Sequence, residues 1–190
     1  MTGNKRKLAI VDLDGTLYDT KQLNYQAYKK AALSLGLEFD LTVQQFSDKC
    51  FGRSYKNFLP EILKYDELYI EKIHNLKVQY YPSMLQYAVE NTALIDILFG
   101  LRQTYYLALV TTASKKNVQD ILAYFGRLEL FDMVITGNDV QLQKPAPEGY
   151  LKAMDKFNIL PENTILFEDN DDCIKTAKEL KMTVFKIIDM

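Results

Sequence analysis

The sequence predicts an α/β fold in which a doubly wound, mostly parallel sheet carries an inserted helical subdomain. Five short segments are almost continuous apolar runs, which is typical of strands covered by helices on both faces. Helical periodicity alternates with the later strands, and this alternation favours a parallel sheet. The chain between the first two strands is far longer than the roughly 30 residues of a whole βαβ unit, which indicates an insertion.

The expected strands span residues 8–13, 106–111, 133–136, 164–168 and 183–188. A helix should follow the second strand, because Ser114 suits an N-cap and Gly126 suits a C-terminal stop. Another should open at Pro147 and Glu148, since proline and an acidic residue both suit a first helical turn. In Rossmann-like sheets of this kind, ligands bind beyond the carboxyl ends of the strands.

The insertion is expected to span residues 19–92, which leaves residues 1–18 and 93–190 as the Rossmann-like core. Leu23, Ala27 and Ala31 share one helical face ahead of Gly36, so the insertion should be helical. Its many tyrosines are expected to pack in a small core rather than to line a pocket.

The composition argues against several classes of function. The 190 residues are 48% hydrophobic and 25% charged, as in ordinary globular proteins. A net charge of -2 gives no reason to expect nucleic acid or an anionic membrane as a partner. Cys50 and Cys173 form neither a metal-ligand spacing nor a disulfide framework, which suits a reducing compartment. No apolar stretch approaches the ~20 residues of a membrane helix, and no signal-peptide pattern opens the chain, so we expect a soluble, cytoplasmic protein.

Polar residues follow four of the expected strands and should meet at one edge of the sheet. They are the carboxylates Asp12, Asp14, Glu168 and Asp169, the hydroxyls Thr111 and Thr112, and Lys144. Taken alone, Asp12 and Asp14 fit a solvated loop as well as a functional site, Thr111 is more typical of a turn, and Lys144 of the surface. The acidic run 168–172 also lacks the glycine and the distal glutamate of an EF-hand loop. Their joint occurrence at one edge is what indicates a functional site.

The charges of these residues predict that the site binds a cation. Like charges ~4 Å apart repel by about 4 kcal/mol at an effective dielectric of 20. Clustered carboxylates therefore require a cation before an anionic substrate can approach, and ligands that are all oxygen favour Mg2+, which also binds phosphate. Lys144 would neutralise further phosphate charge. The set thus predicts Mg2+-dependent phosphoryl transfer on a small phosphorylated metabolite.

Four motifs carry a resemblance to a known family. Asp12-Leu13-Asp14-Gly15-Thr16-Leu17 resembles the first signature of the haloacid dehalogenase-like (HAD) hydrolases. Thr111 at its strand end resembles the second, Lys144-Pro145-Ala146-Pro147 the third and Phe167-Glu168-Asp169-Asn170 the fourth, all in the family's order. By this resemblance the insertion is a helical cap, and the subgroup is that of phosphoglycolate phosphatase and the β-phosphoglucomutase-like phosphatases.

The resemblance implies how the first motif works. Asp12 would be the nucleophile that forms an aspartyl-phosphate. Asp14 would protonate the leaving group and then activate water. An aspartate at position 14 resembles phosphatases and phosphomutases rather than the family's dehalogenases, phosphonatases or ion-pumping ATPases. The implied activity is that of a phosphoric monoester hydrolase.

The other implied roles are phosphate binding and metal binding. The phosphate ligands would be Thr111, Thr112 and Lys144. The metal ligands would be Asp12, Asp14 through its backbone carbonyl, Asp169 and Glu168. Cys173 stands where the family usually has glycine or aspartate, so the resemblance does not fix the geometry of the metal loop at that position.

A sugar phosphomutase of the β-phosphoglucomutase type is the main alternative. Those enzymes resemble the chain around Phe51-Gly52-Arg53-Ser54, but they carry histidine in place of Asn24 and arginine in place of Tyr55. Phosphatase is therefore favoured, with Arg53, Tyr55 and Asn24 as candidate cap contacts for the substrate. An alternative of a different class is a non-catalytic phosphate-binding or regulatory module with this fold.

Overall fold

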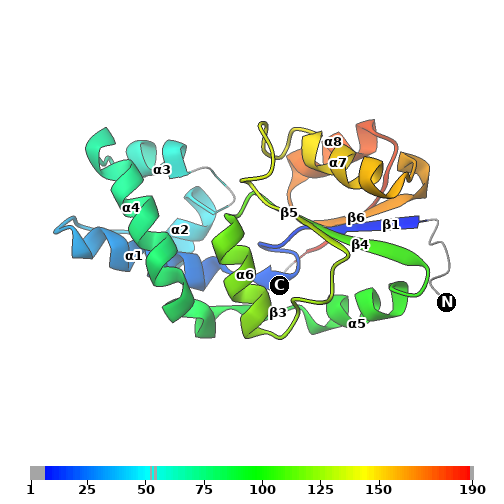
Figure 1. Ribbon diagram of the computed structural model, residues 1–190. Coiled ribbons are helices and arrows are strands. Elements are labelled where there is room, and N and C mark those ends of the chain that lie inside the picture. The colour runs from blue at the N-terminus through cyan, green and yellow to red at the C-terminus, as the bar shows by residue number, and fades with distance from the viewer. Residues whose placement is uncertain (1–6, 52, 54, 189–190) are drawn as a thin grey trace. The chain divides into compact units, whose positions relative to one another are not determined.

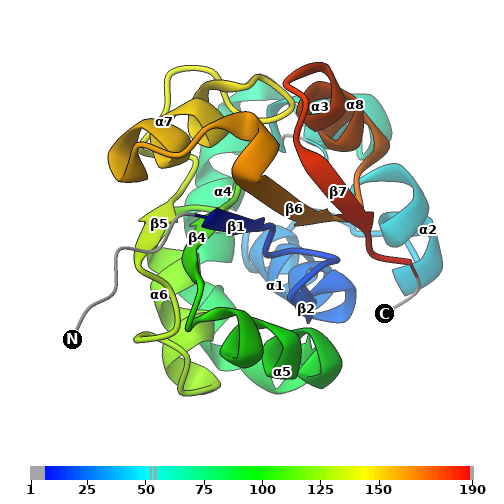
Figure 2. The ribbon, with the colours of Figure 1, turned by 90° about the vertical axis from the view of Figure 1, so that its right-hand side faces the viewer.

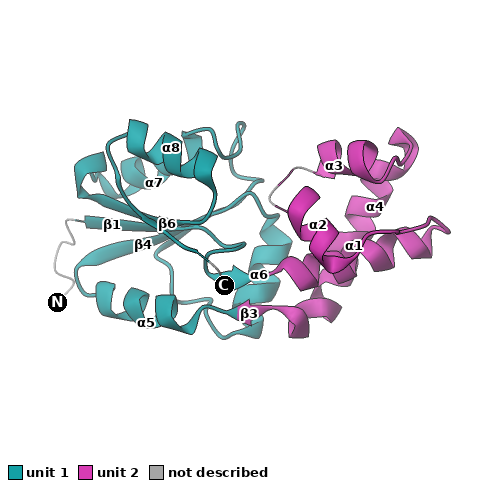
Figure 3. Ribbon diagram, turned by 180° about the vertical axis from the view of Figure 1, so that it is seen from behind, with its two compact units in different colours: residues 1–19, 90–190 teal, residues 20–89 magenta. Residues whose placement is uncertain are grey.

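The computed structural model describes residues 7–51, 53 and 55–188. The chain divides into two compact units, residues 1–19 with 90–190 and residues 20–89 (Figure 3). Two short strands, β2 (Tyr18–Asp19) and β3 (Val89–Glu90), lie where the chain passes between the units, and they pair with each other. No helix within the described ranges is long and apolar enough to cross a membrane.

The first unit is built on a parallel sheet with the strand order β5-β4-β1-β6-β7. Its strands are β1 (Lys7–Val11), β4 (Tyr105–Val110), β5 (Met133–Ile135), β6 (Thr164–Glu168) and β7 (Thr183–Lys186). Ile10 of the central strand β1 pairs with Ala108 on one side and Leu166 on the other. The predicted doubly wound parallel sheet is confirmed, and each strand ends within two residues of its expected end.

Helices cover both faces of this sheet, which explains why its strands are apolar throughout. Figures 1 and 2 show α7 (Glu148–Phe157) and α8 (Asp171–Glu179) on one face, and α5 (Thr92–Leu101) and α6 (Lys115–Tyr124) on the other. A 3-10 turn, η2 (Pro161–Asn163), leads into β6. Tyr150 and Met154 of α7 pack on Leu8 and Ile10 in the buried core. The carboxyl ends of β1, β4 and β6 therefore meet at one edge.

The expected ends of two helices are confirmed. The Ser114 hydroxyl accepts a hydrogen bond from the Asn117 backbone N–H at 3.4 Å and so caps α6. Pro147 and Glu148 open α7, as proline and an acidic residue were expected to do. Helix α8 is capped by Asn170, whose side-chain oxygen accepts from the backbone N–H groups of Asp172 and Cys173.

The second unit is helical and has an aromatic core. It comprises α1 (Lys21–Ser34), α2 (Val43–Lys49), α3 (Tyr55–Ile62), α4 (Glu67–Tyr80) and the 3-10 helix η1 (Tyr81–Tyr87). Tyr25, Tyr28, Phe39, Phe46 and Phe58 are buried together, several of them in edge-to-face pairs. The expectation that tyrosines of the insertion pack in its core is confirmed for Tyr25 and Tyr28.

Candidate active site

The first acidic residue lies directly after the central strand. The Asp12 backbone N–H donates to the Phe167 carbonyl at 3.1 Å, so the β1–β6 pairing extends to this position. Asp12 is only 6% exposed. Strand β1 itself ends at Val11, and Asp14 lies in the turn that follows, where it forms an isolated bridge with Tyr18. Asp14 is half-buried and close enough to add electrostatic repulsion to Asp12.

The turn after Asp12 is closed by its own backbone. The N–H groups of Leu17 and Tyr18 both donate to the Leu13 carbonyl, at 3.0 and 2.9 Å, and Gly15 N–H donates to the Tyr18 carbonyl at 2.8 Å. Gly15 has a φ of +86°, which L side chains rarely adopt. A Cβ there would also lie 2.4 Å from Oδ2 of Asp169. Glycine is thus required both for the turn and for the close approach of the Asp169 carboxylate.

The acidic pair after β6 faces this turn. Glu168 is 1% exposed, and its Oε1 accepts from the backbone N–H groups of Asp169 and Asn170 at 3.2 and 3.1 Å. Oδ1 of Asp169 accepts a hydrogen bond from the Thr16 hydroxyl at 3.1 Å. The sequence prediction did not assign Thr16 a role, although it belongs to the quoted motif; its hydroxyl, two residues after Asp14, was the available signal.

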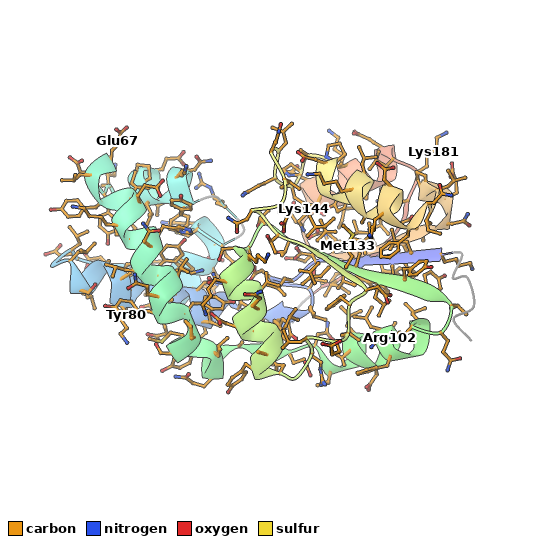
Figure 4. The ribbon with its side chains drawn as sticks, viewed as in Figure 1. Glu67, Tyr80, Arg102, Met133, Lys144 and Lys181 are labelled. Carbon is orange, nitrogen blue, oxygen red and sulfur yellow. The ribbon has the colours of Figure 1, made fainter. Side chains whose placement is uncertain are left out.

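Lys144 joins the two acidic segments. It lies in the loop between β5 and α7 (Figure 4), and its side chain is 7% exposed. Its ammonium donates to Oδ1 of Asp12 and, at 2.8 Å, to Oε2 of Glu168. A buried ammonium is costly unless it is paired and hydrogen-bonded, and here two buried carboxylates meet that requirement.

The loop that carries Lys144 is held from α7. The Glu148 carboxylate accepts the backbone N–H groups of Gln141 at 3.1 Å and Leu142 at 2.8 Å. It also forms an ion pair with Lys152 at 2.7 Å, one helical turn later. These bonds fix the loop from Gln141 to Glu148, and so they limit where Lys144 can reach.

The two threonines differ in setting. Thr111, at the end of β4, is buried; its N–H donates to the Ile135 carbonyl, and its hydroxyl oxygen accepts from Ala113 N–H, both at 3.0 Å. Because a hydroxyl that accepts one bond keeps its own proton to donate, Thr111 retains a donor for an anion. Thr112 is exposed.

Burial and neighbouring charges shift the pKa values of Asp12, Glu168, Asp169 and Lys144. For Asp12, burial and then the charge of Glu168 raise the carboxyl pKa to about 7, although Lys144 opposes the shift. Burial also raises the carboxyl pKa of Glu168 against the effect of Lys144. The pKa of Asp169 is raised by burial and by Asp12. Burial opposes the charge of Lys144, but Asp12 and Glu168 outweigh it and raise the ammonium pKa well above its usual value.

The cluster suits a divalent cation. Asp12, Glu168 and Asp169 each offer a carboxylate oxygen, and these atoms lie within 4.8 Å of one another. Three carboxylates face one ammonium there, and the carboxyl pKa of each is raised, chiefly by burial and secondly by a neighbouring carboxylate in Asp12 and Asp169. A compact set of carboxylate oxygens is the donor chemistry that Mg2+ uses.

Cys173 does not interrupt this cluster. It is buried in the first turn of α8, and its backbone N–H donates to the Asn170 side chain at 3.2 Å. The side chains of Glu168 and Asn170 accept the backbone N–H groups of the loop, and the Cys173 thiol takes part in none of these bonds.

The candidate cap residues belong to the helical unit. The Asn24 amide donates to the carbonyl and the hydroxyl of Thr20, both at 3.1 Å. Arg53 is exposed, pairs with Glu61 and donates to the Lys49 carbonyl at 3.2 Å. Gly52 and Ser54, in the segment that resembles the phosphomutases, lie outside the described residues.

Tyr55 is half-buried in the same unit. Its hydroxyl lies 3.1 Å from both carboxylate oxygens of Glu71, and its ring stacks on His74 with centroids 3.7 Å apart. The described contacts of Asn24, Arg53 and Tyr55 lie inside the helical unit, and the roles of these residues toward a substrate stay predictions.

Comparison with known proteins places the chain in a family. A family model described as haloacid dehalogenase-like hydrolase matches residues 9–187, which is nearly the whole chain. Validoxylamine A 7'-phosphate phosphatase of Streptomyces hygroscopicus subsp. limoneus is 30% identical over 90% of this chain and 81% of its own length. The phosphorylated carbohydrates phosphatase of Thermotoga maritima is 27% identical over 89% and 79%, respectively.

Solved structures share the fold. The crystal structure of CbbY from Rhodobacter sphaeroides in complex with phosphate superposes with a TM-score of 0.82, covering 94% of this chain and 84% of that one, at 23% identity. A likeness at this identity supports the Rossmann-like architecture described above.

Proposed function

We propose that this chain hydrolyses a small-molecule phosphate monoester with Mg2+ through a phosphorylated Asp12. The premise is that the chain belongs to the haloacid dehalogenase-like hydrolase family and is a hydrolase of phosphate esters. The observation that carries this proposal is the buried cluster in which Lys144 binds both Asp12 and Glu168. A structural ion pair alone would not need the third carboxylate, Asp169, within 4.8 Å.

Asp12 is the proposed nucleophile. A carboxylate oxygen of Asp12 attacks phosphorus, so that a new O–P bond forms while the ester O–P bond breaks. The departing ester oxygen takes a proton from Asp14. Lys144 supports this step because its ammonium favours the ionised form of Asp12 and opposes the effect of burial.

Asp14 is the proposed acid and base. Having given its proton to the leaving group, it is a carboxylate that can accept a proton from water. The oxygen of that water then attacks the phosphorus of the aspartyl-phosphate, which releases inorganic phosphate and returns Asp12 as a carboxylate. Asp14 is half-buried in the turn next to Asp12, which is compatible with proton exchange.

The metal ligands would be Asp12, Asp169 and the backbone carbonyl of Asp14, with Glu168 beside them. When bound, Mg2+ supplies positive charge against the oxygens of the transferring phosphoryl group. Thr16 orients Asp169 through the 3.1 Å hydrogen bond, and Gly15 leaves room for that carboxylate. These residues build the ligand set whether or not the ion is present.

Phosphate binding is assigned to Thr111, Thr112 and Lys144. Thr111 is held at the end of β4 with a hydroxyl proton to donate, and Thr112 follows it at the exposed end of the strand. Asn24, Arg53 and Tyr55 of the helical unit are the proposed substrate contacts. Because relatives are named for phosphorylated carbohydrates, sugar phosphates are the first substrates to test.

The test is phosphate release from p-nitrophenyl phosphate and a panel of sugar, nucleotide and three-carbon phosphates. We expect release that requires Mg2+, stops with EDTA and is absent in Asp12→Asn. Release no greater than in Asp12→Asn across the whole panel would overturn the proposal. If a labelled phosphosugar keeps its label and isomerises instead, the enzyme is a mutase.

A further inference from the structure

We propose that Asn91 is a positioning residue that acts through Thr16 on the metal ligand Asp169. The inference rests on the proposed function for the role of Asp169. Asn91 lies between β3 and α5, at the point where the chain has returned from the helical unit. Asn91 belongs to none of the four motifs of the site.

Asn91 makes three hydrogen bonds, two through its side-chain amide and one through its backbone N–H. Its side-chain oxygen accepts from Leu94 N–H at 3.0 Å and caps α5. Its side-chain N–H group donates to the Thr16 carbonyl at 3.1 Å, across 75 residues of sequence. Its backbone N–H donates to the Leu17 carbonyl at 2.9 Å. Aspartate could keep the cap but has no proton to donate to Thr16, and serine could keep the cap but has one hydroxyl on a shorter side chain in place of the separate oxygen and N–H group of the amide.

Thr16 connects Asn91 to the acidic cluster through two hydrogen bonds. It is fully buried, with Asn91 at its carbonyl and Oδ1 of Asp169 at its hydroxyl, 3.1 Å away. The adjacent Gly15 lies so near Asp169 that even a Cβ would be 2.4 Å from the carboxylate. A shift of the Thr16 backbone would therefore move the group that orients Asp169.

The segment around Asn91 has an anchor of its own. The neighbouring Glu90 carboxylate accepts two hydrogen bonds from the Arg127 guanidinium, at 3.0 and 2.9 Å. This bidentate pair holds the end of β3 independently of Asn91. A substitution at Asn91 should thus leave the segment in place while removing the bond to Thr16.

The proposal predicts a defect in metal affinity rather than in folding. Outer partners of metal ligands typically change affinity 10–100-fold. We expect Asn91→Ser and Asn91→Asp to raise the Mg2+ concentration for half-saturation at least about tenfold, measured by calorimetry without substrate and by activation of p-nitrophenyl phosphate hydrolysis. The added charge of Asn91→Asp would by itself favour Mg2+, so weaker binding in that variant cannot be a charge effect.

The path through Thr16 is tested by a double-mutant cycle. Thr16→Val removes the hydroxyl and keeps the shape, and it should also weaken Mg2+ binding. The double variant Asn91→Ser/Thr16→Val should bind Mg2+ no more weakly than Thr16→Val alone, because both act on Asp169 by one route. Fully additive losses would overturn the proposal.

The remaining outcomes are also decisive. If Asn91→Ser and Asn91→Asp bind Mg2+ as the wild type does, Asn91 only caps α5 and the proposal is wrong, whatever happens to the melting temperature. If the wild type itself binds no Mg2+ and releases no phosphate, the proposed function fails, and this inference fails with it. If the wild type turns over normally and the variants bind Mg2+ with the same affinity as the wild type, the proposed function stands and only the inference about Asn91 fails.

Discussion

The two units of the molecule bury polar groups in different ways. In the first unit, the buried Lys144 donates to two carboxylates, and a third carboxylate lies close by. In the helical unit, the buried Lys77 lies over the rings of Tyr28 and Tyr81, with its ammonium 5.4 and 4.6 Å from the centroids. Charges that an incoming metal and phosphate would change stabilise Lys144, whereas contacts with aromatic faces contribute to the stabilisation of Lys77.

Because of this difference, the first unit indicates the type of reaction, whereas the interior of the helical unit does not indicate the substrate. The charged cluster of the first unit specifies a chemistry, because only a few reactions use carboxylates, a lysine and a hydroxyl at one sheet edge. The interior of the helical unit consists of rings such as Tyr25, Phe46 and Phe58 in edge-to-face contact, and it specifies packing. Loss of a charged group should therefore reduce activity, and loss of an aromatic group should reduce stability.

The largest effect is expected for Asp12→Asn. Without a nucleophilic carboxylate, kcat should fall more than about 10³-fold. The fold should persist, because the change also removes the repulsion between Asp12 and Glu168 in the metal-free protein. Phosphate release and near-ultraviolet circular dichroism on the same preparation check both parts. Residual turnover above one-tenth of the wild-type rate, roughly 1.4 kcal/mol of barrier, would remove Asp12 from the nucleophile role.

Phe58→Ala should produce the largest loss of stability. Phe58 is 2% exposed and meets Tyr28 edge to face, with centroids 5.1 Å apart. Removing a buried ring typically costs about 3–5 kcal/mol. Urea unfolding should report that loss, whereas Leu68→Ala on the exposed surface of the same unit should change the free energy of unfolding by no more than about 0.5 kcal/mol. Equal effects of the two variants would mean that the aromatic core does not stabilise the unit.

The free energy of unfolding of the metal-free protein should decrease as pH rises, which is opposite to the usual effect of carboxylates. The carboxyl pKa values of Asp12, Glu168 and Asp169 are raised in the fold, chiefly by burial, so the folded state holds more protons than the unfolded state. Their contribution to stability is fully present below about pH 4 and is lost as pH rises, for Asp12 through about 7.

Mg2+ should reverse that trend, since it binds the ionised carboxylates. The rise in melting temperature on adding Mg2+ should be small near about pH 5 and larger near about pH 8, with EDTA as the control. A Mg2+ shift that is independent of pH, or largest in acid, would show that the cation binds elsewhere.

Glu148→Ala should have the smallest effect. It releases the backbone N–H groups of Gln141 and Leu142, so the loop that carries Lys144 becomes less well fixed. We expect kcat to fall by about tenfold or less, because Lys144 keeps its two carboxylate partners. Lys152→Ala is the matched control, since it removes the ion pair and leaves both backbone bonds. Equal losses in the two variants would assign the effect to the ion pair.

Much of the fold could be predicted from the sequence, because its information is local. Apolar runs locate the buried strands, and Ser114 and Pro147 mark helix starts through interactions within a few residues. The prediction extended the first strand too far, to residue 13. The chain turns back at Leu13, whose carbonyl binds Leu17 and Tyr18, and periodicity does not report such a turn.

The missing parts of the site are contacts between distant segments. The bonds from Asn91 to Thr16 and from Thr16 to Asp169 span 75 and 153 residues. They depend on how the turn after β1 packs against the end of β6 and the start of α5. The spacing of residues in the sequence does not predict this packing. The polar residues at the strand ends could be identified one by one, but their supports could not.

The most direct measurement of the central claim is mass spectrometry of the Asp12 peptide, quenched in acid during turnover of p-nitrophenyl phosphate with Mg2+. We predict that this peptide gains the mass of one phosphoryl group, that fragmentation assigns the group to Asp12, and that the gain is absent in Asp12→Asn and with EDTA. Rapid turnover with an unmodified Asp12 at every quench time, or a phosphoryl group on another residue, would contradict the account.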